Sequence, residues 1–349
     1  MKKFWSLLLV IVMIAAMSAC GGYGGNDTSS NSGSSTPPAS TSDPAPSTTP
    51  DASADAIHLK LSHPSAEGGP YDLMSKKFAE LVAEKSGGKY AIDIFAANAL
   101  GTQEEVLDAV SLGTLDLAVT SDDILAKYAP EWGYIGLPFL FDDVDDVDEN
   151  LNGELGAYLS SKLEDKGMFI ISFFENGFRN VTANKEINLP EDLSGLKIRV
   201  MTNEPLRAMF TNAGAVVTNV SFSELYQALQ LGTCEAQENP FANIRDKKFN
   251  EVQQYLCVTM HSHTAEPLVM SKDLFDGLSA EDQEMFKAAG LEASKWAYQY
   301  AKDTDAENRA YLESVMTVTD PDRAAWKEFA EQTNASYMEQ YSEVSQLKK

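Results

Sequence analysis

The chain has 349 residues, of which 27 are Lys or Arg and 52 are Asp or Glu, so its formal net charge is -25 at pH 7. This length exceeds that of one small domain and suits two lobes of ordinary size, and a hydrophobic content of 44% is enough for buried cores. The strong acidity argues against nucleic acid or an anionic membrane surface as a partner.

The N-terminal segment has the layout of an export signal. Lys2 and Lys3 precede an apolar run that reaches Met17, and this run is too short for a stable membrane span. Small residues then precede Cys20, as in a bacterial lipobox. We expect residues 1–19 to be a signal peptide and Cys20 to be the lipidated first residue of the mature chain. An ordinary signal followed by a chance cysteine is the alternative.

Residues 20–56 are expected to form a flexible tether. After the cysteine they consist mainly of Gly, Ser, Thr, Pro, Ala and Asp, with Tyr23 as their one aromatic residue. Such a composition cannot bury a core. The lipid on Cys20 would therefore anchor the protein on the extracytoplasmic side of the membrane, and the tether would let the folded part stand away from it.

The folded part begins with an alternation of strands and helices. A helical spacing of apolar residues runs from Leu73 to Val82. Thr102 and Glu105 form a capping box that opens a second helix, which ends at Gly113. Three segments alternate as short strands: residues 57–61, 90–95 and 115–120. This order predicts a parallel sheet with helices on its faces.

A pattern of five residues recurs 119 positions later in the chain. The first copy is Glu105, Ala109, Gly113, Thr114 and Asp116, and the second is Glu224, Ala228, Gly232, Thr233 and Glu235. Each copy reads as a capped helix, a glycine stop and a short strand, so we expect both lobes to contain the same unit. Helices opened by Thr102 and Ser221 would then offer unpaired amides toward a shared cleft. Coincidence is the alternative, because capped helix starts and glycines at helix ends are common in proteins.

Two arginines lie twenty positions apart in the middle of the chain. The apolar run of residues 168–174 predicts a central buried strand, and Arg179 follows it. Residues 196–201 alternate, which places Arg199 within a strand. A guanidinium on a strand cannot deprotonate and needs an anion. A structural salt bridge and a clamp on a ligand carboxylate are the two interpretations.

The last third of the chain is predicted to be mainly helical. The expected elements are strands at residues 256–259 and 268–270, a helix from Ser279 to about Ser314, a strand at 315–319 and a helix at 321–345. A helix longer than 25 residues is unusual in a globular domain.

Several possible chemical sites are not supported by the spacing of their residues. The carboxylate-rich segment 142–150 lacks the glycine and glutamate positions of an EF-hand, and His261 and His263 lack further zinc ligands, so no metal is predicted. Cys234 and Cys257 could form a disulfide or be buried free thiols. Hydrolase, zinc-protease and phosphate-loop motifs are absent from the sequence, so we expect neither a cofactor nor enzymatic activity.

Four spaced motifs resemble the solute-binding proteins of TRAP transporters, the DctP family. They are residues 176–180, 195–200, 222–230 and 237–240. The resemblance implies an α/β, two-lobed, periplasmic-binding-protein-like (type II-like) fold with a long helix spanning both lobes. Lobe I would comprise residues 57–176 plus about 265–304, and lobe II residues 177–264 plus about 305–349.

The resemblance also implies a function. An extracytoplasmic receptor of this family would capture a small carboxylate, such as a C4-dicarboxylate or a sugar acid like a uronate, and deliver it to a membrane permease with a small and a large subunit. At family positions, Arg199 would pair with the ligand carboxylate, Arg179 would add a second cation, Asn239 an amide and Phe222 an apolar wall.

Other residues of the predicted cleft bear on the choice of ligand. His63, Ser121 and His263 are expected on loops that face the cleft. Sialic-acid binders carry Glu and Arg where this chain has Ser121 and Ile124, so sialic acid is disfavoured. A binding protein of an ATP-driven importer, a ligand sensor for a kinase and a secreted enzyme are the alternatives.

Overall fold

The computed structural model describes residues 47–48 and 55–349, which all fall in the unit formed by Pro44–Lys349. The predicted signal peptide, Cys20 and nearly all of the predicted tether lie outside the described residues. Within the described part, no helix combines the length and the apolar character needed to cross a bilayer.

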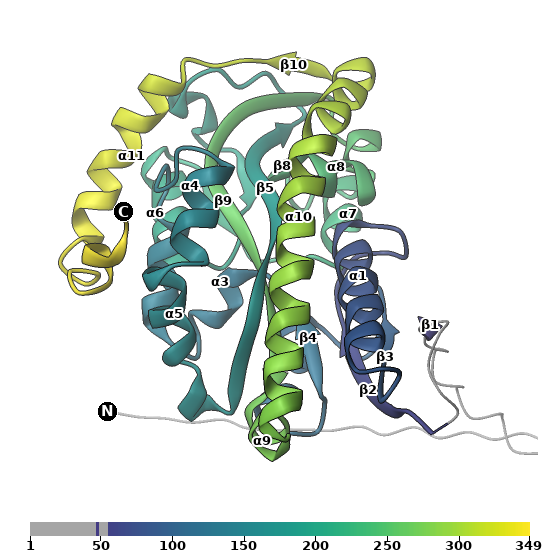
Figure 1. Cartoon of the computed structure of the whole chain (residues 1–349). Coiled ribbons are helices and arrows are strands. Elements are labelled where there is room, and N and C mark those ends of the chain that lie inside the picture. The colour runs from purple at the N-terminus through teal and green to yellow at the C-terminus, as the bar shows by residue number, and fades with distance from the viewer. Residues whose placement is uncertain (1–46, 49–54) are drawn as a thin grey trace, which may run out of the picture. The chain divides into compact units, whose positions relative to one another are not determined.

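Ten strands of the described chain form a single mixed sheet (Figure 1). They are β1 (Ser47–Thr48), β2 (Ile57–Ser62), β3 (Tyr90–Phe95), β4 (Leu117–Val119), β5 (Met168–Ala183), β6 (Lys197–Arg199), β7 (Val216–Thr218), β8 (Ala236–Pro240), β9 (Tyr255–Ser271) and β10 (Thr317–Thr319). The order is β1-β3-β2-β4-β9-β5-β8-β6-β7, and β10 pairs with β9. Strand β2 is parallel to β3 and β4, and β6 is parallel to β7 and β8. The predicted parallel arrangement is confirmed.

The α-helices cover this sheet. They are α1 (Pro70–Lys85), α2 (Gln103–Ser111), α3 (Asp122–Leu125), α4 (Val144–Leu151), α5 (Glu154–Ser161), α6 (Glu204–Asn212), α7 (Leu225–Gln230), α8 (Phe241–Asp246), α9 (Lys272–Gly277), α10 (Ala280–Val315) and α11 (Arg323–Tyr337). Helix α10 has 36 residues, and the side chain of Ser279 caps its N-terminus by accepting from the backbone N–H of Asp282. The predicted long helix is therefore confirmed.

Strands β5 and β9 are long enough to belong to both parts of the sheet. We call the part around β2, β3 and β4 the first lobe and the part around β6, β7 and β8 the second lobe. The antiparallel register of β5 and β9 shifts between Glu175 and Phe178 and again between Arg179 and Val181. Gly177 lies in the first of these breaks. Its φ of 104° is a backbone conformation that residues other than glycine rarely adopt. The two lobes therefore meet at a pair of interrupted strands.

Each lobe has its own buried core, and α10 contributes to both. In the first lobe, Phe78 of α1 and Phe286 of α10 are fully buried together. In the second lobe, Leu312 near the other end of α10 packs with residues of α7 and α8. Figure 1 shows α10 running from α9 to β10. The prediction that one helix spans both lobes is confirmed.

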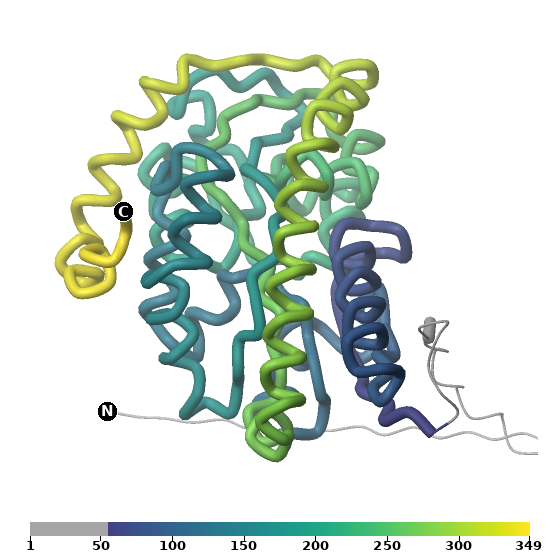
Figure 2. The backbone as a smooth tube through the Cα atoms, in the orientation of Figure 1, coloured from purple at the N-terminus to yellow at the C-terminus, as the bar shows by residue number. Residues whose placement is uncertain are grey.

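The C-terminal helix returns to the second lobe. Trp326 of α11 is fully buried in the core that also contains β6 and α6, and Nδ2 of Asn212 donates to Oγ1 of Thr333 at 2.9 Å. Figure 2 traces this yellow segment back alongside α6. Beyond α11, Tyr341 and Val344 join the core that contains residues of α4 and α5.

The predicted strands at 256–259 and 268–270 are parts of one 17-residue strand, β9. The prediction of two strands was wrong because the intervening polar residues, 261–264, resemble a loop in sequence. In the structure all four are buried within β9. Ser262 and His263 pair with β5, and the two histidines contact the buried carboxylates of Glu238 and Glu175.

The repeated helix-to-strand unit has the same geometry in both lobes. Gly113 and Gly232 both have φ of 70°. The backbone N–H of Thr114 donates to Ala109 at 2.9 Å, and that of Thr233 donates to Ala228 at 2.9 Å. The glycines allow the left-handed turn that ends each helix before the next strand. The two helix starts differ, because Thr102 caps α2 directly whereas α7 begins at Leu225, four residues after Ser221.

Candidate functional site

A cleft of about 580 Å³ lies between the lobes, at the carboxyl ends of the parallel strands. Segments that follow β3 and β4 form one wall, and segments that follow β6 and β7 form the other. Ligands of open α/β sheets bind at this edge. The lining residues are Asn98, Thr102, Gln103, Glu104, Ser121, Asp123, Ile124, Lys127, Arg199, Val200, Thr202, Arg207, Asn219, Val220, Ser221, Phe222 and Ser223. Thr102 and Ser221 both contribute to this lining, although only Thr102 caps a helix.

Arg199 ends β6 and lines the cleft, although 93% of its surface is covered. Its Nε donates to the carbonyl of Val220 at 3.0 Å. Its two terminal nitrogens have no hydrogen-bond or ion-pair partner within residues 47–48 and 55–349. Burial lowers the pKa of the Arg199 guanidinium, with a further contribution from the charge of Arg179. A buried cation of this kind gains from any carboxylate that enters the cleft.

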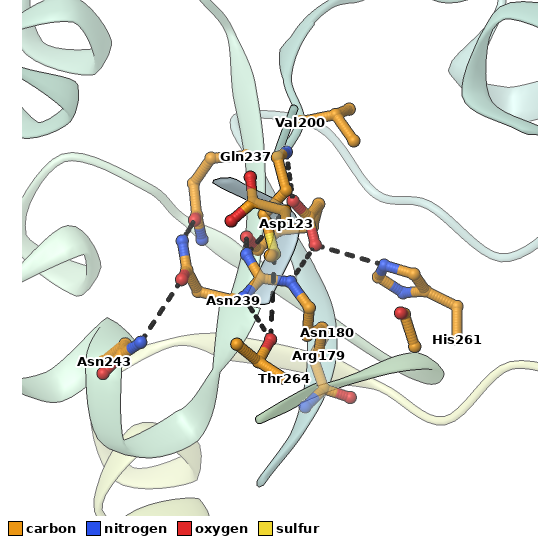
Figure 3. A network of polar contacts seen from close by, with 12 residues as sticks. Asp123, Arg179, Asn180, Val200, Gln237, Asn239, Asn243, His261 and Thr264 are labelled. Carbon is orange, nitrogen blue, oxygen red and sulfur yellow. Dashed lines mark hydrogen bonds and ion pairs between the residues drawn. The ribbon is translucent and has the colours of Figure 1, made fainter. Parts of the chain in front are cut away.

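Arg179 has a different environment from Arg199. Its guanidinium forms an ion pair with Glu238 of β8, and its Nη1 donates to Oγ1 of Thr264 at 2.8 Å (Figure 3). Nε2 of His261 lies 3.3 Å from the same Glu238 carboxylate. Burial alone would raise the pKa of Glu238, but the Arg179 charge and the His261 hydrogen bond bring it down to about 2. Arg179 is therefore satisfied inside the protein and does not line the cleft.

The two other residues expected from the family motif are in separate places. Phe222 lines the cleft, and Nζ of Lys247 lies 5.1 Å from the centroid of its ring. Asn239 lies in β8 beside the Arg179 network, where its Nδ2 donates to Gln237 and its Oδ1 lies 3.5 Å from Nδ2 of Asn243 (Figure 3). Asn239 is outside the cleft lining.

Ser121 lines the cleft, and its Oγ donates to Oδ1 of Asp123 at 2.6 Å. His63 lies on a loop but is buried, with its Nε2 3.4 Å from Oδ1 of Asp72. His263 is buried within β9 and lies 2.8 Å from both carboxylate oxygens of Glu175. The expectation that His263 lies on a loop was wrong, because His263 belongs to β9 and pairs with Phe178 of β5.

Asp123 and Arg207 were missed by sequence reasoning. Asp123 lies in α3, directly after β4, and is 5% exposed. Its Oδ2 accepts from both the backbone N–H and the hydroxyl of Thr202 at 2.7 Å, which joins the two lobes across the cleft. Arg207 comes from α6, and among the described residues its guanidinium makes one hydrogen bond, to the carbonyl of Val200 at 3.5 Å. The position of Asp123 shortly after the end of β4 was the available signal, whereas Arg207 lies within a helix and had no comparable signal.

A second cavity of about 240 Å³ lies on the α10 side of the strand breaks. Glu175, Gly177, Tyr300 and Asp305 contribute to its lining, and arginine does not. An anionic ligand would find less favourable charge there than beside Arg199. Cys234 and Cys257 are both buried and free.

Residues 61–341 match the family described as bacterial extracellular solute-binding protein, family 7, DctP. The C4-dicarboxylate-binding periplasmic protein DctP of Rhodobacter capsulatus is 32% identical over 79% of this chain and 85% of its own length. An uncharacterized protein of Sinorhizobium fredii is 36% identical over 76% of this chain, which corresponds to 49% of that protein.

The fold has equally clear relatives. A crystal structure of a TRAP periplasmic solute binding protein from Roseobacter denitrificans, with bound L-galactonate, has a TM-score of 0.79 and 30% identity. The similarity covers 84% of this chain and 99% of that chain. The predicted two-lobed α/β fold is confirmed, and fold and cleft together define an extracytoplasmic solute-binding protein. This chain belongs to bacterial extracellular solute-binding protein family 7, the DctP family of TRAP transporters.

Proposed function

We propose that this protein captures a small carboxylate, a C4-dicarboxylate or a sugar acid, in the cleft between its lobes. The observation that carries this proposal is the almost fully buried guanidinium of Arg199, whose two terminal nitrogens have no partner in the described part of the chain. A planar guanidinium can bind both oxygens of a carboxylate, and such charge-assisted pairs are among the strongest hydrogen bonds in proteins. The Rhodobacter relative is described as a C4-dicarboxylate binder and the Roseobacter structure holds L-galactonate.

The seven predicted ligand-binding residues have two different roles in this proposal. Arg199, Ser121 and Phe222 contact the ligand, because they line the cleft.

The remaining four, Arg179, Asn239, His63 and His263, are buried behind it. They hold the strand ends and the strand breaks in place. Arg179 acts through its ion pair with Glu238, whose Oε1 also accepts from the backbone N–H of Met201, two residues after Arg199.

Ligand binding would favour closure of the lobes, since a ligand can contact both walls at once only when they are close together. We further propose that the closed form delivers its ligand, chemically unchanged, to a TRAP permease of one small and one large membrane subunit. A lipid on Cys20 and the tether of residues 21–56 would keep the receptor near that permease. The family membership supports these partners, and the N-terminal sequence supports the anchor.

Thermal unfolding of the purified protein tests the carboxylate requirement. A ligand at 100 times its dissociation constant stabilises the native state by about 2.7 kcal/mol. We expect stabilisation by members of a panel of dicarboxylates and sugar acids, and no effect of the matched alcohols, such as galactitol beside galactonate. Mass spectrometry of the recovered ligand should show no turnover. The proposed function would be contradicted if an acid and its matched alcohol stabilised the protein equally. It would also be contradicted if no acid of the panel stabilised it.

A further inference from the structure

The charges in the cleft distinguish between the two ligand classes. We propose that the cleft selects a hydroxylated monocarboxylate, that is a sugar acid, over a dicarboxylate. This inference rests on the proposed function, because it assumes that one carboxylate is held by Arg199. It concerns the cleft residues that contact the rest of the ligand, beyond the carboxylate held by Arg199.

The lining carries a net charge of +1 before any ligand enters. Five charged side chains face the cleft: Arg199, Arg207, Lys127, Asp123 and Glu104. Lys127 and Glu104 form an ion pair with each other at the exposed rim. The two arginines and Asp123 remain, and neither arginine has an ion-pair partner among the residues that the structure describes. One ligand carboxylate would neutralise this set, whereas a second would leave it with an excess negative charge.

Asp123 is the group that a second carboxylate would meet. Its side chain is buried, and three donors hold it in place: the hydroxyl of Ser121 and the backbone N–H and hydroxyl of Thr202. An ionised carboxylate only accepts hydrogen bonds. It therefore suits a ligand hydroxyl and repels a ligand carboxylate, and repulsion is strong where water is excluded.

Neutral polar side chains make up much of the remaining lining. They include Asn98, Gln103, Asn219, Ser221 and Ser223. In Gln103 the amide oxygen accepts from the hydroxyl of Thr120 and the backbone N–H of Ser121, which leaves the amide N–H groups for a ligand.

Amides and hydroxyls both donate and accept, as a ligand hydroxyl requires, whereas a carboxylate requires donors alone. The volume of about 580 Å³ is within the range of sites for larger organic ligands, so a chain of several hydroxylated carbons has room.

Matched pairs of acids test the proposal by titration calorimetry on the purified protein. Threonate and tartrate, galactonate and galactarate, and gluconate and glucarate each share a carbon chain and differ at one terminus, which is a hydroxymethyl group or a second carboxylate. We expect the monoacid of the pair that fits best to bind about a hundredfold more tightly than its diacid and than succinate.

The outcomes separate this inference from the proposed function. If a diacid or succinate binds as tightly as the best monoacid, through Arg199, the inference is overturned and the proposed function stands. If no acid binds, both are overturned.

Replacement of Asp123 by Asn tests the mechanism of selection. Asp123→Asn keeps the shape and removes the negative charge. The preference for monoacid over diacid should fall about tenfold, because the repulsion is lost. A merely structural role would weaken both ligands equally and leave their ratio unchanged, which would contradict the inference. Glu281→Gln removes a carboxylate from the exposed first turn of α10 and is the control.

Discussion

Replacement of Arg199 by Lys keeps the positive charge in the cleft and removes the planar fork. In the structure, Nε of Arg199 is occupied by the carbonyl of Val220, and the two terminal nitrogens are available to a ligand. A lysine presents one nitrogen, so it cannot reproduce two parallel hydrogen bonds to a carboxylate.

The expected loss follows from this count of donors. At least one charge-assisted hydrogen bond disappears, and such bonds contribute about 1.5–3 kcal/mol each. This corresponds to a roughly 10- to 150-fold rise in the dissociation constant, since about 1.4 kcal/mol is a factor of ten. Titration calorimetry with the best ligand of the acid panel measures it directly.

A matched control is available on the same strand. Lys197 is exposed, lies two residues before Arg199 and is outside the cleft lining. Lys197→Gln removes one positive charge near the site and should leave the affinity within about twofold, because exposed charges are screened by salt. If the Arg199→Lys protein is stable without ligand and binds as tightly as the parent, the guanidinium does not bind both oxygens of the ligand carboxylate and the reasoning is refuted.

Three further substitutions test the interior around the site. Glu238→Gln leaves Arg179 buried without its counter-charge and should lower the unfolding free energy by about 3–5 kcal/mol in urea titrations. Burial, with a contribution from Asp123, raises the pKa of Asp122 to about 7 from its ordinary 3.8. The native state therefore binds more protons than the unfolded state between these values, and stability falls as pH rises from about 4 to about 7 by on the order of 4 kcal/mol. Asp122→Asn should flatten that slope in urea midpoints measured across the window. Gly290→Ala should destabilise by about 1–3 kcal/mol in a thermal unfolding assay, because an added Cβ would lie 2.3 Å from Cγ2 of Ile171.

Each of these substitutions has its own control or opposing result. Glu235→Gln changes an exposed carboxylate of the same region and should have little effect, so equal losses for Glu235 and Glu238 would contradict a specific role of the buried pair. An unchanged pH slope in Asp122→Asn would show that this carboxyl titrates normally. Gly290→Ala is compared with Gly277→Ala, since an added Cβ at Gly277 meets no atom within 4 Å.

The secondary structure of this protein was largely determined by local sequence. The capping box of Thr102 and Glu105, the glycine stops at 113 and 232 and the uninterrupted helical pattern after Ser279 all predicted elements that the structure contains. Such signals depend only on residues a few positions apart, so they can be recognised in the sequence without the tertiary structure. Arg199, Ser121 and Phe222 all line the cleft. Arg199 and Phe222 were expected there from the family resemblance and Ser121 from its loop, and their contact with a ligand stays a prediction.

Tertiary structure alone decided the roles of the two arginines. Arg179 follows a strand-like segment and Arg199 lies within one, and their sequence contexts do not distinguish an internal ion pair from a guanidinium that is open to a ligand. Glu238 lies 59 positions after Arg179 and reaches it only because β5 and β8 pair antiparallel. Asp123 meets Thr202 because two lobes face each other at strand ends. The sign and number of charges in a cleft depend on contacts between distant residues, and these exist only once the chain has folded.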